Sequence, residues 1–171
     1  MDANVYVVLR VLHILVAALW VGAAGLLATV VMPAVGDAGA AGGSVMASLH
    51  RRKLHVFMAS TALLTVISGV WLYWVLTTGF DLAIVRSRGG LVFGIGGLCG
   101  LLALIIGGGI IGPGFARLAE LAGQTDAMPE IERAAHSQRV AAIRRRTMLA
   151  SKCALALMVI ALLLMAMGHY V

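Results

Sequence analysis

Acidic side chains are scarce in this chain, and none of them lies inside its long apolar runs. The sequence has seven Asp and Glu residues against thirteen Lys and Arg residues. Proton- and ion-coupled transporters place carboxylates within their membrane spans, so this class is disfavoured. The sequence also has no phosphate-binding glycine loop followed by a lysine, and no nucleophile paired with a base, which disfavours nucleotide-driven pumps and hydrolases.

Cysteine is equally rare, since Cys99 and Cys153 are the only two and lie at different depths in apolar segments. The sequence therefore predicts no disulfide scaffold. Charged residues make up 12% of the chain and hydrophobic residues 61%, with a mean hydropathy of +1.01. A soluble domain of this size cannot bury so much apolar surface, so the composition predicts an integral membrane protein.

Four continuous apolar runs predict the fold. A helix needs about 20 apolar residues to cross a bilayer, and continuous runs favour helices over the alternating strands of a membrane barrel. We expect a single all-α domain covering residues 1–171, built as a four-transmembrane-helix bundle. The predicted spans lie at about 5–33, 54–77, 90–114 and 147–170.

The connectors between the spans carry their own signals. The segment GDAGAAGGS predicts a short flexible connector after the first span. Pro113 is expected to end the third span. Pro129, followed by Glu130 and Glu132, is typical of a helix start, and this helix is expected to run into the fourth span.

Positive charge is concentrated in the first and third connectors. No reading motif accompanies these residues despite a pI near 10.2, so nucleic acid is not an expected partner. Basic residues beside apolar spans instead set topology and contact anionic lipid. Both connectors are therefore expected in the cytoplasm, with both termini on the outer (periplasmic) side. The basic residues are Arg51, Arg52 and Lys53, then Arg117, Arg133, Arg139, Arg144, Arg145 and Arg146.

Glycine is abundant in the third span, where several pairs stand four residues apart. Such small-xxx-small patterns predict close packing of helices, and room for a flat cofactor against the helix is the alternative. The pairs are Gly90 and Gly94, Gly96 and Gly100, and Gly108 and Gly112.

The first span holds the most informative pattern. His13 lies inside this apolar run, with Arg10 three residues before it and Trp20 seven residues after it, all on one helix face. An ionisable residue within a span usually has a function. A neutral imidazole can ligate haem iron, and an arginine can bind a propionate. The alternative is a histidine hydrogen-bonded to a neighbouring Ser or Thr, with Arg10 snorkelling to headgroups.

The residues His13, Trp20 and Gly22, in LHILVAALWVG, resemble the first-helix signature of a group of small bacterial membrane proteins. The group includes the membrane domain of the copper-resistance protein D family and the membrane-bound four-helix type of protoporphyrinogen oxidase. The resemblance implies a multi-pass protein of the bacterial inner membrane, with haem b on His13 as in the oxidase branch. The Asn-Glu-containing motif of that branch is absent, so its activity is not implied.

Further residues complete the haem hypothesis. Arg86 and Arg88 in the second connector are additional propionate candidates, and Trp20 is expected to pack beside the porphyrin. Met158 or His169 in the fourth span is the candidate second axial ligand. A five-coordinate iron held by one histidine remains open.

Copper offers a second reading of the last span, where Met165, Met167 and His169 supply thioether and imidazole ligands. Residues two apart on a helix point in different directions, so these three converge only if the helix end unwinds.

Three histidines lie in the basic connectors. His50 and His55 are five residues apart, a poor spacing for two ligands on one helix face. With His136 they would form a metal site only if the two connectors converged, and solvated histidines are the alternative.

The leading hypothesis is a membrane-embedded b-type haem protein acting in electron transfer or as a redox-active subunit, hence an oxidoreductase if it is an enzyme. The alternatives are a copper-handling membrane protein without haem and a structural accessory subunit of a larger membrane complex. The expected partners are the lipid bilayer and a redox partner protein or larger complex. Homo-oligomerisation is left open.

Overall fold

The computed structural model describes residues 2–122, 129–168 and 170, and every regular element in this part of the chain is a helix. Four helical stretches are long and apolar enough to cross a membrane, as expected of a multi-pass membrane protein. The expected all-helical architecture is thus confirmed for the described residues. The four stretches are Asn4–Asp37, Leu54–Leu76, Arg88–Leu121 and Glu132–Met167.

The first span continues through Pro33 because a π-helical turn precedes the proline. α1 (Ala3–Leu26) passes into η1 (Leu27–Val31) and then into α2 (Met32–Asp37), whose second residue is Pro33. The first backbone N–H after η1 bonds to the carbonyl five residues earlier. In a regular α-helix a proline ring collides with the carbonyl four residues before it. The wider π turn gives that carbonyl room.

The third span repeats this arrangement, so the expectation that Pro113 ends it is wrong. α6 (Arg88–Ile106) is followed by η2 (Gly107–Ile111) and α7 (Gly112–Ala122), and Pro113 is again the second residue after the π turn. Because the π turn accommodates the proline ring, the helix continues beyond it. The shared order of elements and the shared proline position indicate that the two halves of the bundle follow one plan.

The segment GDAGAAGGS is mostly helical, which corrects the expected flexible connector. It contributes the end of α2 and the start of α3 (Ala40–Arg51), and only Ala38 and Gly39 separate the two helices. Gly39 has a φ of 55°, a left-handed conformation that glycine adopts without strain. The alanines on either side favour helix, so a single sharp turn replaces a loop.

The remaining two spans are α4 (Leu54–Leu76) and α8 (Glu130–Met167). The corner between α3 and α4 is made by Lys53, which has a φ of 58°. α8 begins directly after Pro129 and runs for 38 residues. The prediction of a helix that starts at Pro129 and enters the fourth span is confirmed.

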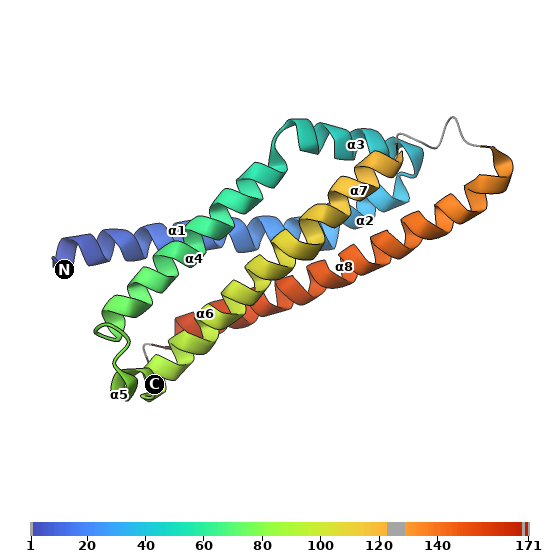
Figure 1. Cartoon of the computed structure of the whole chain (residues 1–171). Helices are drawn as coiled ribbons and strands as arrows, with labels where there is room; N and C mark the ends of the chain where they lie inside the picture. Colours follow the sequence, from blue (N-terminus) through green and yellow to red (C-terminus); the bar gives the residue numbers. More distant parts are fainter. Residues whose placement is uncertain (1, 123–128, 169, 171) are drawn as a thin grey trace.

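Two helix pairs make up the bundle. α1 packs along α4, α6 packs along α8, and contacts of α4 with α6 and of α1 with α8 join the pairs. Figure 1 shows α5 (Leu82–Val85) beside the start of α6, at the same end of the bundle as the start of α1, while α3, α7 and the first turns of α8 lie toward the opposite end. We call this opposite end the basic end. It carries Arg51, Arg52, Lys53, Arg144, Arg145 and Arg146.

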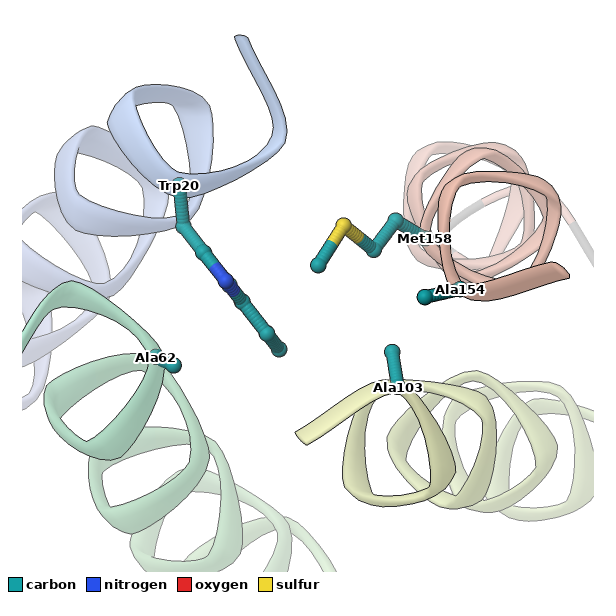
Figure 2. Packing of buried hydrophobic residues seen from close by; sticks show 5 residues of the cluster. All are labelled: Trp20, Ala62, Ala103, Ala154 and Met158. Carbon is teal, nitrogen blue, oxygen red and sulfur yellow. The ribbon is translucent and has the colours of Figure 1, made fainter. Parts of the chain in front are cut away.

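The core lies where the two pairs meet, around the indole of Trp20. This side chain is 5% exposed and packs with Ala62 of α4, Ala103 of α6, and Ala154 and Met158 of α8. Figure 2 shows the indole pointing from α1 into the space between the other three helices. The small alanine side chains make room for one large ring. Packing of this kind, rather than exclusion of water, holds helices together in lipid.

The glycines of the third span divide between packed and open positions. A Cβ on Gly96 would lie 3.4 Å from a side chain of α8, and one on Gly94 would lie 2.9 Å from the hydroxyl of Tyr73 on α4. No atom lies within 4 Å of the corresponding point on Gly100 or Gly108. Close helix packing is therefore confirmed for Gly94 and Gly96, which face α4 and α8 respectively.

Candidate functional site

His13 lies between α1 and α4 and is 8% exposed, although its neighbours Leu12 and Ile14 face outward. Its Nδ1 is 2.9 Å from Oγ of Ser68 on α4. Gly69 allows the ring to approach the α4 backbone, because a Cβ there would be 2.9 Å from Cε1 of His13 and 3.8 Å from Nε2. The imidazole is thus held by a hydrogen bond and by close contact with a glycine. The bond to Ser68 is the one that the alternative to haem ligation predicts, a histidine hydrogen-bonded to a Ser or Thr.

The hydrogen bonds of Ser68 determine which nitrogen of His13 carries the proton. Oγ of Ser68 is 2.6 Å from the Leu64 carbonyl oxygen and 3.1 Å from that of Thr65. Both carbonyls can only accept, so the single hydroxyl proton of Ser68 is directed to the α4 backbone. With its proton directed to the α4 backbone, Ser68 accepts from His13, and we infer that the imidazole proton is on Nδ1. Nε2 is left as the nitrogen with the lone pair.

The three arginines that the sequence offers as propionate partners lie toward the same end of the bundle. Ser68 is eight residues from the end of α4 at Leu76, which places His13 about 12 Å from that helix end. Arg10 is half-buried one turn outward on α1. Arg86 and Arg88 are exposed on either side of the α5–α6 junction.

Trp20 and Met158 belong to the core described above. Both are buried, and they lie in one cluster two helical turns along α1 from His13. Figure 2 shows the Met158 side chain extending toward the indole. The structure therefore brings Met158 to Trp20. His169, the other candidate second ligand, lies outside the described residues.

Met165 and Met167, the methionines of the copper alternative, do not lie in the same environment. α8 stays helical as far as Met167, so the end does not unwind before this residue. Cγ of Met165 is 3.4 Å from the Cβ position of Gly96, whereas Met167 is exposed. The described part of α8 consequently does not bring the two thioethers together, and His169 again lies outside it.

The imidazoles of His50 and His55 stack, although their sequence spacing argued against a shared helix face. Their ring centroids are 4.6 Å apart and the ring planes differ by 17°. The spacing argument assumed one helix, but the two residues belong to α3 and α4, which meet at the corner formed by Lys53. His136 does not join them, because it lines a hollow between α7 and α8.

Ser68 and Gly69 are the site residues that sequence reasoning did not identify. Their signal was present, since a serine followed by a glycine interrupts an otherwise apolar run in α4. Thr61, Thr65 and Ser68 also lie on one face of α4, and each hydroxyl donates to a carbonyl four residues earlier. The sequence does not show how α1 and α4 are aligned. This alignment places Ser68 beside His13, and not Thr61 or Thr65.

No group of three or more His, Cys, Asp or Glu side chains that could hold a metal ion exists among the described residues. Cys99 and Cys153 are both free thiols, as expected. Comparisons with protein-family models, with curated protein sequences and with solved structures found no match.

Proposed function

We propose that this chain is a membrane-embedded b-type haem protein that transfers electrons, with His13 as an axial ligand. The observation that carries the proposal is the hydrogen bond between His13 Nδ1 and Ser68 Oγ inside a membrane span. A metal-ligating histidine characteristically donates its other ring N–H to a protein oxygen, which fixes its tautomer and orientation. Ser68 supplies that oxygen and leaves Nε2 to coordinate.

The donors of this chain fit a haem better than a bare metal ion. A zinc ion draws its protein ligands from His, Cys, Asp or Glu side chains, and the described residues hold no cluster of three such groups. The thioethers of Met165 and Met167, which the copper alternative needs, face different surroundings. A haem iron takes its equatorial donors from the porphyrin and needs only one or two from the protein. His13 provides one. The resemblance of His13, Trp20 and Gly22 to the first helix of the haem-binding group supports the same assignment.

Each residue of the site has a defined part. Ser68 orients the imidazole, and Gly69 permits its approach to α4. Arg10, one turn outward, would hold a propionate by a charge-assisted hydrogen bond, with Arg86 and Arg88 as further candidates near the surface. Bound haem supplies one-electron chemistry. The apolar outer faces of α1 and α4 keep water from His13, which favours the neutral ligating imidazole.

The basic end faces the cytoplasm in this proposal, because basic residues beside membrane spans are retained on that side. The start of α1 and the α5 corner then face the periplasm of a bacterial cell. The haem would lie in the outer half of the inner membrane, within reach of a periplasmic or membrane-bound redox partner.

A visible spectrum of the full chain tests the proposal. Protein produced with an adequate haem supply and purified in mild detergent should show a Soret band, and His13→Ala should abolish or shift it. His136→Ala and His50→Ala serve as matched controls, since both residues lie at the basic end, and their spectra should equal that of the unsubstituted chain. Folded protein without a Soret band, or an unchanged spectrum in His13→Ala, would refute the assignment.

A second candidate function is that of an accessory subunit whose third span packs against another membrane protein. The observation in its favour is the open surface of α6 at Gly97 and Gly100, where no atom lies within 4 Å of a Cβ position. Glycines at helix surfaces allow another helix to approach closely. Gly100→Leu should then release a co-purifying partner on a native gel, while the haem spectrum stays unchanged.

A further inference from the structure

Two adjoining hollows lie at the basic end, between the α2–α3 turn, α7 and α8. The larger has a volume of about 570 Å³ and the smaller about 240 Å³. Their walls share four residues, three apolar and one charged, so the hollows meet on either side of a single arginine. The shared residues are Leu118, Val140, Arg144 and Met148. The larger hollow falls within the range of about 300–1,000 Å³ that is usual for ligand sites.

The exposed side chain of Arg144 reaches from α8 to α2. Its guanidinium lies directly against Gly36, where any Cβ would overlap it. Glycine at this position thus allows the charged group of α8 to reach α2. Arg145 lines the larger hollow beside it. Within the described part of the chain neither arginine forms an ion pair, so two cationic groups border a largely apolar space without a protein anion to neutralise them.

The hollows lie at the membrane surface of this end. Arg144 and Arg145 stand directly before the last apolar stretch of α8, one face of which is buried in the bundle at Thr147, Ala154 and Met158. Basic residues at this position contact the headgroups of anionic lipids. The apolar walls match an acyl chain, whereas a free phosphate would leave them without a partner. A zwitterionic headgroup would bring an ammonium group beside the arginines, which is unfavourable.

We propose that these hollows form a binding site for one anionic phospholipid, whose phosphate is held by Arg144 and Arg145 and whose chain lies along Leu118, Val140 and Met148. The lipid belongs to the leaflet at the basic end. This site is separate from His13 and does not depend on haem.

The test uses the full chain, delipidated in mild detergent and titrated with phosphatidylglycerol, phosphatidylcholine or inorganic phosphate. Binding is measured by native mass spectrometry and by the shift in unfolding temperature. We expect phosphatidylglycerol to bind most tightly, and Arg144→Gln to weaken it about fivefold, the effect of one arginine near a membrane surface. Arg117→Gln is the matched control, because Arg117 is an exposed arginine of α7 that lines neither hollow, and it should leave the affinity unchanged.

A second variant tests the cavity without altering charge. Ala141 is exposed and lines the larger hollow, so Ala141→Trp should fill it, keep the helical circular-dichroism spectrum and abolish binding of phosphatidylglycerol. Unimpaired binding in Ala141→Trp would overturn the site. Equal losses of affinity in Arg144→Gln and Arg117→Gln would show that binding depends on general charge attraction and not on this site. Equal binding of phosphatidylcholine, or full competition by inorganic phosphate, would show that an anionic lipid is not the ligand.

Discussion

Gly69→Ala is the substitution that examines the His13 site most directly. The added methyl would lie 2.9 Å from Cε1 of His13, closer than two carbon atoms can approach, so the imidazole must turn away. Turning it breaks the hydrogen bond to Ser68, and such a bond between membrane helices contributes about 0.6 kcal/mol on average and at most about 1.7 kcal/mol. Rotating the ring off its preferred rotamer costs about 0.5–1.5 kcal/mol more.

Replacing glycine by alanine inside a helix also stabilises the helix by about 0.5–1 kcal/mol. This gain must be separated from the destabilisation that the contact with His13 causes. Gly97→Ala measures this gain alone, because no atom lies within 4 Å of the Cβ position of Gly97 on α6. We therefore expect Gly69→Ala to be less stable than Gly97→Ala by about 1–3 kcal/mol in detergent-induced unfolding followed by circular dichroism. Equal stabilisation by the two substitutions would refute the close contact between His13 and Gly69.

Four further substitutions, at three positions, probe the packing of the bundle. Ser68→Ala should lower stability by at most about 1.7 kcal/mol and should change the reduction potential of bound haem, which a purely structural serine would leave as it was; redox titration distinguishes the two. Trp20→Ala should cost about 3–5 kcal/mol, as for buried tryptophans elsewhere, and Trp20→Phe clearly less, because the indole fills the centre of the bundle; a small loss in thermal unfolding would contradict this. Tyr73→Phe removes the 3.1 Å bond to the Gly90 carbonyl between α4 and α6 and should cost about 0.5–1.5 kcal/mol, so an unchanged unfolding curve would argue against that bond.

The features that sequence predicts well here are those set by composition over long stretches. Four apolar runs were sufficient to place the spans, since each exceeds the length that a bilayer requires. The unbroken course of α8 followed from Pro129 and the acidic residues of its first turn. His13 and Trp20 could be assigned to one buried face because helical periodicity alone fixes their relative direction.

The errors came where local residues were interpreted without the backbone around them. Pro113 is a helix breaker in an α-helical frame, but it follows a π turn that removes the collision. The stacking of His50 on His55 depends on the corner at Lys53, whose positive φ no spacing rule anticipates. Ser68 lies 55 residues from His13 in the sequence, and such a contact depends on how two helices align.

The two halves of the bundle share one order of elements, and comparing them shows why His13 is the haem-ligand candidate. His13 and Phe93 each stand 20 residues before the proline that follows a π turn, at Pro33 and Pro113. Each ring also presses on a glycine of its partner helix: His13 on Gly69, and Phe93 on Gly168, whose Cβ position lies 2.6 Å from the phenyl ring. A ring against a glycine is therefore the packing that this fold uses to join each helix pair. Only the first half fills that place with a ring that can coordinate a metal, and only there does a serine hold it by a hydrogen bond. Phe93 shows that a ring can pack against a glycine without a coordinating nitrogen, so this packing alone does not require a histidine at position 13.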